Sequence, residues 1–272
     1  MATPDLDSAP LKVLMHGVSG RMGTAILNGV LQVGGVDVVG GVRGKIGPES
    51  ITVPGSECVI PIFTELDKAL SACSPDVLVD FTNSRVGFKG ISTALSKQVH
   101  VITGTTGFSS DELTKLDALA NNFAVGLVVA PNFALGAVLL ASLARIAAQH
   151  FDFAEIVESH HEAKLDSPSG TALAIADALV EGHQQQFLLA STEKETLPGT
   201  RGADKDGVVI HSIRIPGLLA RHEVILGMTG QTLTLKHDTI NRECYVPGVL
   251  AAIRKVSSYR GLVFGLEKVL GF

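Results

Sequence analysis

The chain has no tryptophan, and only two tyrosines and three cysteines occur among its 272 residues. Cys58, Cys73 and Cys244 are odd in number and far apart, so they form neither a disulfide framework nor a CxxC pair. This use of cysteine is typical of a protein in a reducing compartment. It also excludes a metal site built from paired thiolates.

The sequence also lacks blocks of like charge and apolar runs long enough to span a bilayer. The net charge is −5 and no basic stripe is present, so we expect neither nucleic acid nor a membrane as a partner. The first ten residues have no secretory pattern and are too acidic for a transit peptide, so we expect a frayed tail. These absences together predict a cytoplasmic protein. The hydrophobic fraction of 46% predicts a globular fold of one large or two ordinary domains.

Short apolar segments alternate with helical ones through the first half of the chain. Apolar strands that do not alternate with polar residues, separated by helices, are typical of a parallel sheet covered on both faces. The sequence therefore predicts a doubly wound α/β domain. The expected strands are Leu11–His16, Val36–Val42, Val77–Phe81, Val99–Thr103 and Ala124–Ala130, and the expected helices are Met22–Val33, Val86–Lys97 and Ser110–Asn121.

The pattern changes after Pro131, where longer helices and alternating strands begin. These segments predict a second, α+β domain whose strands are antiparallel or mixed. Residues 182–207 are polar and irregular, and an apolar tail follows the last expected helix. The expected helices are Leu135–Gln149, Gly170–Glu181 and Cys244–Ser257, and the expected strands are Phe153–Ser159, Val208–Ile213, Glu223–Gly227 and Thr232–Lys236.

A glycine-rich loop follows the first expected strand and opens the first helix. Gly17 permits the tight turn, Gly20 lets the backbone approach a pyrophosphate, and Gly23 allows the helix to pack closely on the strand. The helix N-terminus then offers amide donors to phosphates. Glycine triplets also occur in ordinary turns, but the strand–loop–helix context favours a dinucleotide site. Its predicted cofactor-binding residues are Gly17, Val18, Ser19, Gly20, Arg21, Met22 and Gly23.

Two cations follow the second expected strand, where a dinucleotide site normally places an acid for the adenosine ribose. Arg43 and Lys45 occupy this region, and the first acid is Glu49. Cations there suit the 2′-phosphate of NADPH by charge and, for arginine, by geometry. Each cation taken alone is almost equally compatible with a solvated turn.

Two further loops follow strands, at the sheet edge where ligands of open α/β sheets collect. Both offer small residues and backbone groups to a flat ring, although either is also compatible with a plain turn. The predicted cofactor contacts in these loops are Gly104, Thr105, Thr106, Ala130, Pro131, Asn132 and Phe133.

The most informative segment of the chain runs from Glu158 to Thr171. It places His160 and His161 beside Lys164, so a proton-transfer group and a cation lie together. Adjacent histidines lack the spacing of a helical metal pair and no cysteine is near, so we expect no metal. A lone histidine in a loop is usually a surface residue, whereas this combination favours catalysis.

The same segment ends in a Pro-Ser-Gly-Thr turn that opens a helix. Pro168 fits the first helical turn, and either Ser167 or Ser169 fits the N-cap. The amides of Gly170 and Thr171, with the Thr171 hydroxyl, would bind a carboxylate. Ordinary capping explains the same residues and is compatible with that role.

These motifs together resemble the 4-hydroxy-tetrahydrodipicolinate reductase family, from Leu11 to the end of the chain. The resemblance rests on the glycine loop, the VDFT strand end with Phe81, GTTG, APNF and the segment ESHHEAKLDSPSGTA. It implies a Rossmann-type domain, residues 1–133 completed by 241–272, interrupted by a substrate-binding and oligomerisation domain, residues 134–240. It also implies NADPH or NADH as cofactor, a cyclic imine dicarboxylate as substrate, and a homotetramer formed through the sheet of the inserted domain.

The resemblance also implies site roles. His160 is the expected proton donor and Lys164 its partner, while His161, Ser169, Gly170 and Thr171 bind the substrate; Phe81 joins the cofactor contacts. After the Ser212–Arg214 strand the chain departs from the commoner bacterial pattern and is similar to the cyanobacterial and plant-type branch, so no role is given to Arg221 or His222.

Two alternatives remain open at this point. Another nicotinamide oxidoreductase with an inserted domain would suit the glycine loop; an aspartate dehydrogenase is one case, and an aldehyde-forming dehydrogenase, which needs an activated cysteine, is another. A redox-sensing dinucleotide-binding protein would keep the loop without needing the histidines and lysine.

Overall fold

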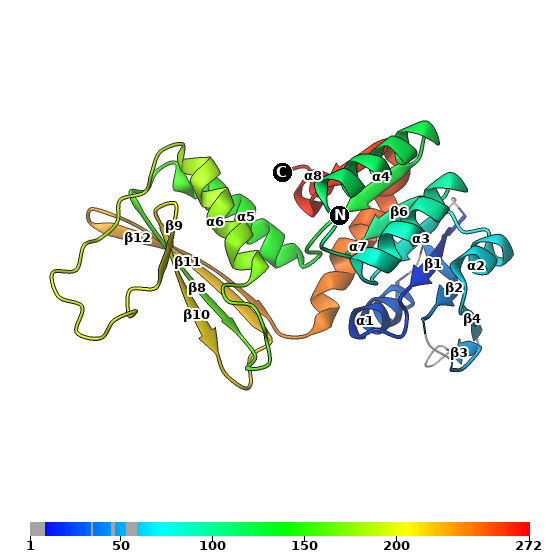
Figure 1. Ribbon diagram of the computed structural model, residues 1–272, viewed down its shortest axis with the longest axis horizontal. Coiled ribbons are helices and arrows are strands. Elements are labelled where there is room, and N and C mark those ends of the chain that lie inside the picture. Colours follow the sequence, from blue (N-terminus) through cyan, green and yellow to red (C-terminus); the bar gives the residue numbers. More distant parts are fainter. Residues whose placement is uncertain (1–8, 34, 45–46, 53–58) are drawn as a thin grey trace. The chain divides into compact units, whose positions relative to one another are not determined.

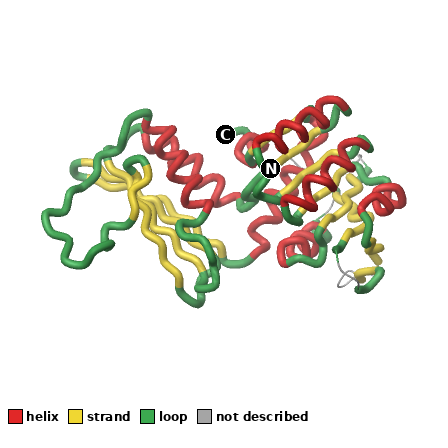
Figure 2. Tube along the Cα trace, in the orientation of Figure 1, coloured by secondary structure: helices red, strands yellow, loops and turns green. Residues whose placement is uncertain are grey.

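We describe the protein from a computed structural model, in which the described residues are 9–33, 35–44, 47–52 and 59–272. The chain divides into two compact units. Unit 1 comprises Met1–Phe133 and Tyr245–Phe272, and unit 2 comprises Ala134–Cys244. Figure 1 labels the elements, and Figure 2 separates helices from strands by colour. Among the described residues, no helix combines the length and apolarity needed to cross a membrane.

Unit 1 is built on an eight-stranded sheet with the order β13-β7-β6-β5-β1-β2-β4-β3. Neighbouring strands run parallel except β3 and β4, which are antiparallel. Every residue of β5 and of β7 is buried, because helices cover both faces of the sheet. The strands are β1 Leu11–His16, β2 Val36–Val42, β3 Ser50–Thr52, β4 Val59–Phe63, β5 Val77–Asp80, β6 His100–Thr103, β7 Gly126–Val129 and β13 Gly261–Phe264.

The helices of unit 1 begin where the sequence supplies caps. The Ser109 hydroxyl accepts from the amide of Glu112, and the Glu112 side chain accepts from the amide of Ser109, which forms a capping box for α4. Asn83 caps α3 by accepting from the amide of Val86. The helices are α1 Arg21–Val30, α2 Leu66–Cys73, α3 Ser84–Ser96, α4 Ser110–Asn122, α7 Val246–Lys255 and α8 Leu266–Leu270.

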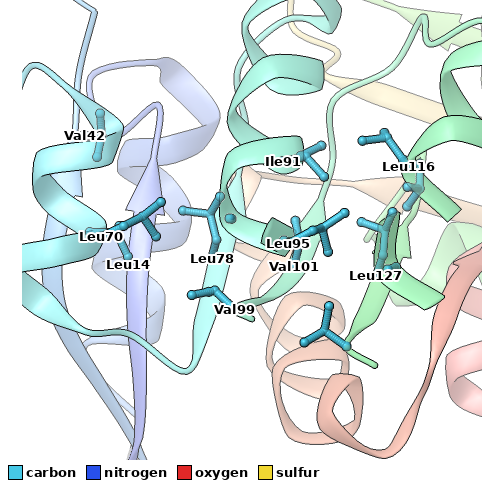
Figure 3. Close-up of a cluster of buried hydrophobic side chains, with 14 of the residues drawn as sticks. Leu14, Val42, Leu70, Leu78, Ile91, Leu95, Val99, Val101, Leu116 and Leu127 are labelled. Atoms are coloured by element: carbon cyan, nitrogen blue, oxygen red, sulfur yellow. The ribbon is translucent and has the colours of Figure 1, made fainter. Parts of the chain in front are cut away.

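The core of unit 1 follows from the alternation of side chains along its strands. Leu14 joins a buried cluster with residues of α2, α3 and α4, several of which Figure 3 labels. Val13 and Met15 are also fully buried and point to the opposite face of the sheet, because successive strand residues alternate. Polar residues occur at the carboxyl ends of β1, β5 and β6, where the following loops begin.

Unit 2 has a five-stranded mixed sheet with the order β12-β11-β8-β10-β9. The central β8 runs parallel to β10 and antiparallel to β11. The helices that contain Arg145 and Gly182 pack against each other and on the sheet. A Cβ on Gly182 would lie 2.0 Å from the carbonyl oxygen of Arg145, so only glycine allows the two helices to approach so closely. The elements are α5 Leu135–Ala148, β8 Phe153–His160, α6 Gly170–His183, β9 Ala203–Lys205, β10 Val208–Arg214, β11 Ala220–Met228 and β12 Gln231–Thr239.

The predicted fold class is confirmed: a Rossmann-type parallel sheet occurs with a second, smaller α+β unit. The structure also contains elements that the sequence did not predict, namely β3, β4, α2, β9, β13 and α8. β3 and β9 have three residues each, and β4 carries Pro61. The apolar tail, left without secondary structure in the prediction, forms β13 and α8. The last predicted helix is shorter, since 3-10 turns at Arg242–Tyr245 and Val256–Ser258 flank α7.

Candidate active site

The glycine loop lies between β1 and α1 as predicted. Gly17 has φ +91°, and a Cβ on it would lie 2.6 Å from the carbonyl oxygen of Phe81. A Cβ on Gly23 would lie 2.1 Å from the carbonyl oxygen of Gly17, so the helix packs against the turn itself. Gly20 caps α1 without a side-chain hydrogen bond, and the first turn holds no acid. The amides at this helix start therefore suit an anion such as a pyrophosphate.

The side chains of the loop differ in their exposure. Val18 is buried, so only its backbone is available to a ligand. Ser19, Gly20 and Arg21 are exposed, while Met22 is half-buried.

Arg43 follows β2 directly, and its side chain lies along the next loop. Its Nη1 is 3.4 Å from the carbonyl oxygen of Pro48, and the guanidinium packs on Gly47. The adjacent strand end, residues 42–44, carries no acid. This arrangement leaves the 2′-phosphate interpretation for Arg43 as a prediction. Lys45 lies outside the described residues.

A buried carboxylate links the carboxyl ends of three neighbouring strands. Asp80 ends β5 and is fully buried. Its Oδ2 accepts hydrogen bonds from the hydroxyls of Thr103 at 2.8 Å and Thr105 at 2.7 Å. Its Oδ1 accepts from the Thr82 hydroxyl at 2.8 Å and lies 2.8 Å from Nδ1 of His16, at the end of β1.

The Asp80 network keeps this carboxylate ionised. Burial alone raises the pKa of Asp80, but the contact with His16 and the hydrogen bonds from Thr105 and Thr103 bring it below its usual value. The network fixes the two loops that follow β5 and β6, because both contribute donors to one carboxylate. Sequence reasoning missed Asp80, although an acid that ends an otherwise apolar strand was a visible signal.

The GTTG and APNF loops lie beside this network. A Cβ on Gly104 would lie 2.2 Å from the ring of Phe81, and that ring lies 5.7 Å from the ring of Phe133. Thr105, Ala130 and Phe133 are buried, so their side chains support the loops and do not reach outward. Thr106 and Pro131 are exposed and Asn132 is half-buried.

In unit 2, strand β8 ends in a buried pair formed by Glu158 and His160. These residues are two positions apart and share the face of the sheet that the helices cover. His160 Nδ1 lies 2.6 Å from Glu158 Oε2. Arg214, which ends the neighbouring β10, donates from Nη2 to Oε1 at 2.7 Å and from Nη1 to Oε2 at 3.0 Å. This is the bidentate pairing that arginine makes with carboxylates.

The loop after β8 brings Lys164 and Asp166 together. The Lys164 ammonium donates to Asp166 Oδ1 at 2.7 Å. Arg214 Nη2 also donates to the carbonyl oxygen of Asp166 at 2.7 Å, which fastens the loop to β10. His161 is half-buried, and its carbonyl oxygen accepts from the amide of Lys164.

The start of α6 has one of the two N-cap residues that the sequence allows. Ser169 is the N-cap, and its hydroxyl accepts from the amide of Ala172 at 3.1 Å. Pro168 therefore precedes the cap, so its predicted place in the first helical turn is wrong. A Cβ on Gly170 would meet nothing within 4 Å, and a hydrogen bond from the Gly170 amide is one of the causes that lower the pKa of Asp166, after the larger effect of Lys164.

Ser169 is used within the protein. It is buried, its hydroxyl also lies 3.1 Å from Nε2 of His222, and its amide donates to Glu158 Oε1 at 3.2 Å. Its direct contact with substrate stays a prediction, and so do the predicted substrate contacts of Gly170 and Thr171.

Burial and neighbouring charge set the titration of the histidines. Burial lowers the pKa of His160; Glu158 raises it in part, while Lys164 and Arg214 lower it further. Burial lowers the pKa of His222 to about 4, with a further contribution from His160. The two rings meet edge to face with centroids 5.3 Å apart. A lowered pKa makes His160 a stronger acid once it is protonated.

Arg214 and His222 were missed because their roles depend on strand register. Arg214 pairs with His160 across β10 and β8, and His222 pairs with Glu158 across β11 and β8. The cysteines do not offer a nucleophile in the described part of the chain: burial raises the pKa of Cys73 and Cys244. Cys58 lies outside it. The described residues contain no group of three or more histidine, cysteine or acidic side chains placed to hold a metal ion.

Comparison with known proteins gives a consistent result over nearly the whole chain. The family model described as dihydrodipicolinate reductase, N-terminus, matches residues 11–133, and that described as dihydrodipicolinate reductase, C-terminus, matches residues 136–270. The 4-hydroxy-tetrahydrodipicolinate reductase of Dehalococcoides mccartyi is 42% identical over 261 residues, which cover 96% of this chain and 98% of that protein. The protein of the same name from Bacillus pumilus is 39% identical over the same coverage.

Solved structures agree with the sequence comparison. A dipicolinate-bound dihydrodipicolinate reductase from Paenisporosarcina sp. TG-14 has a TM-score of 0.87 and 36% identity, covering 96% of this chain and 99% of that one. An amine dehydrogenase from Mycobacterium smegmatis has a TM-score of 0.65 at 16% identity, covering 94% of this chain and 95% of that one. The second likeness shows a shared fold alone.

Proposed function

The chain belongs to the dihydrodipicolinate reductase family, and from that membership we propose that it reduces 4-hydroxy-tetrahydrodipicolinate to tetrahydrodipicolinate with NADPH or NADH, a step of lysine biosynthesis. The observation that carries the proposal is the arrangement at the end of β8. A buried histidine paired with Glu158 lies near the N-terminus of α6, because Glu158 also accepts a hydrogen bond from the amide of the N-cap residue Ser169. The first is suited to proton transfer and the second to a substrate carboxylate.

The reaction needs one hydride and one proton. The substrate carries a hydroxyl that the product lacks, so water leaves and a conjugated imine results. Bound NADPH or NADH supplies the hydride. The electron pair displaced by the hydride is then neutralised by a proton, and the residues of unit 2 provide that proton.

His160 is the proposed proton donor, because its Nδ1 is engaged by Glu158 while its ring lies at the end of the strand. Lys164 supplies positive charge; its present partner Asp166 is exposed, so a substrate carboxylate competes for the same ammonium. Gly170 and Thr171 bind a ring carboxylate through their amides and the Thr171 hydroxyl. His161 lines the pocket.

Unit 1 is proposed to bind the dinucleotide. The glycine loop suits a pyrophosphate, since a Cβ on Gly17 or Gly23 would clash with the backbone and the start of α1 carries no competing acid. The Asp80 network fixes the loops after β5 and β6, which are proposed to contact the nicotinamide. Arg43 is proposed to contact the 2′-phosphate of NADPH, and Lys45 is proposed to join it.

Unit 2 is further proposed to form the contacts of a homotetramer. Its helices cover one face of the mixed sheet, and the strands place Ile213 and Ile225 on the other. Light scattering on the purified protein measures the mass directly. A cytoplasmic location and the cyanobacterial or plant-type branch both stay predictions.

The test of the proposed function is an assay with freshly generated substrate that follows loss of the reduced nicotinamide by absorbance. We expect turnover with NADPH and with NADH, and none when oxaloacetate with ammonium, or an aspartyl phosphate, replaces the substrate. Turnover of either replacement at a comparable rate would favour another nicotinamide oxidoreductase.

A further inference from the structure

Glu158 has more hydrogen-bond partners than any other carboxylate of unit 2. None of the roles predicted for the reaction belongs to it. It is fully buried and lies two residues before His160 on β8. Its Oε1 accepts from Arg214 and from the amide of Ser169, and its Oε2 accepts from Arg214 and lies beside His160 Nδ1. Both oxygens are therefore saturated with partners.

These contacts require Glu158 to be ionised. Burial raises its pKa, but the hydrogen bonds from Arg214, Ser212 and His160 bring the pKa below its usual value. An ionised carboxylate only accepts hydrogen bonds, so the proton between Oε2 and the imidazole belongs to Nδ1. Neutral His160 must then carry its hydrogen on Nδ1 and leave Nε2 as the basic atom.

We propose that Glu158 is the positioning residue of the proton donor: it holds His160 in the Nδ1–H form and makes Nε2 the atom that carries the reacting proton. The inference rests on the proposed function of His160. A carboxylate that orients an imidazole through Nδ1 acts in the same way in other acid–base sites. No hydrogen bond joins Nε2 to another residue in the described part of the chain, which leaves it for a ligand.

Glu158 also fixes the spacing between the acid and the carboxylate-binding helix start. Through Arg214 it is tied to the carbonyl oxygen of Asp166, and it accepts directly from the N-cap residue of α6. One carboxylate therefore joins β8, β10, the loop with Lys164 and the start of α6. Replacing it disturbs the geometry of all four.

The charges around His160 determine the expected pH dependence. Glu158 on β8 favours the protonated ring, while Arg214 on β10 and Lys164 in the loop disfavour it. His222 on β11 is its other titratable neighbour, and Asp166 is paired with Lys164. Removing Glu158 thus leaves the cations unopposed and lowers the pH at which His160 loses its proton.

The test is the pH profile of kcat in Glu158→Gln. A general acid is lost as pH rises through its pKa, so we expect the basic limb to move about one unit or more toward acid. At the wild-type optimum kcat should fall about tenfold or more, whereas KM for NADPH should not change. A kcat that falls with the basic limb unmoved would show a merely structural role and overturn the inference.

Glu155→Gln is the matched control. Glu155 lies on the same strand, faces the other side of the sheet and has the same partner types, Arg201 at 2.7 Å and His211 at 2.9 Å. We expect its kcat profile to keep the wild-type basic limb. An equal shift in the control would mean that any acid on β8 has this effect, which would also overturn the inference.

A second measurement needs no variant of Glu158. Nitrogen-15 NMR of ring-labelled histidine in the solid protein distinguishes the two tautomers, and the His160 signals are those lost in His160→Gln. We expect the Nδ1–H form in the wild type at neutral pH; the Nε2–H form would overturn the inference. A wild type with no reductase activity would overturn the proposed function instead, and the NMR result separates the two failures.

Discussion

The imidazole Nδ1 of His16 lies 2.8 Å from Oδ1 of Asp80, and the two residues are direct neighbours at the ends of β1 and β5. Three threonine hydroxyls complete the shell of this carboxylate. The pair therefore joins the strand that opens the glycine loop to the loops after β5 and β6. Its loss should affect both stability and cofactor binding.

Asp80→Asn tests that connection. The asparagine side chain puts an NH2 donor where the Asp80 carboxylate has an accepting oxygen, and the partners around it are themselves donors. We therefore expect the free energy of unfolding to fall by about 3 kcal/mol. KM for NADPH should rise, since the loops lose their common anchor. Asp76→Asn is the control: Asp76 is exposed at the other end of β5 and accepts from the amide of Lys12, so its loss should cost about 1 kcal/mol at most. Equal costs in urea denaturation would contradict the account.

His222 should make the protein sensitive to moderate acid. Burial lowers its pKa to about 4 from an ordinary 6.5, so between these values the unfolded chain binds a proton that the folded chain does not. The contribution of His222 to the free energy of unfolding is therefore complete above about pH 6.5 and is lost as the pH falls toward 4. At pH 4.5 the loss amounts to about 2 to 3 kcal/mol. His222→Gln should lose less stability between pH 7 and pH 4.5 than the wild type. In thermal melts, the exposed control His150→Gln should behave as the wild type does; a steeper loss in His222→Gln would refute this assignment.

Pyridine-2,6-dicarboxylate is planar and mimics the two carboxylates of the product, so it should compete with the imine substrate. Thr171→Val removes one hydrogen bond to a charged group, and we expect the inhibition constant to rise about tenfold to a hundredfold, which corresponds to about 1–3 kcal/mol. Thr232→Val, on an exposed position of β12, should leave it unchanged. An inhibitor whose binding ignores Thr171 would place the carboxylate site elsewhere.

Because of the cations after β2, the enzyme should use NADPH at least as well as NADH. Replacing Arg43 and Lys45 by alanine should raise KM for NADPH more than for NADH, with kcat similar. The advantage of NADPH should shrink at high salt, because exposed charges are screened within about 10 Å at 0.1 M. Lys68→Ala with Lys97→Ala removes two exposed cations elsewhere on unit 1 as the control. Equal losses for the two cofactors would make Arg43 and Lys45 solvated turn residues.

The parts of the site that sequence reasoning predicted are those that are contiguous in the chain. The glycine loop follows from local rules, since its turn needs Gly17. The start of α6 follows in part, since a cap needs a serine there, but the sequence left Ser167 and Ser169 open. Arg214 and His222 reach Glu158 and His160 only through the registers of β10 and β11 against β8. No local pattern specifies those registers, so these residues were missed.

In the fold, too, elements set by local sequence were predicted and elements set by distant contacts were not. Long elements with strong periodicity, such as α4 and α5, were predicted nearly to their ends, because burial of one face fixes them. The short edge strands β3 and β9 depend on a neighbour for their hydrogen bonds and carry little pattern of their own. β13 pairs with β7 from more than a hundred residues away, a contact that the apolar tail did not reveal.

The central claim is that His160 delivers the proton in the reduction, and the turnover number of His160→Gln at saturating substrate and NADPH tests it most directly. We expect kcat to fall about a hundredfold or more, the scale for a positioned acid, while the dissociation constant of NADPH stays as in the wild type. Lys164→Ala should show a loss of similar size, and the exposed control His150→Gln should show none. A His160→Gln enzyme that turns over at nearly the wild-type rate would contradict the account.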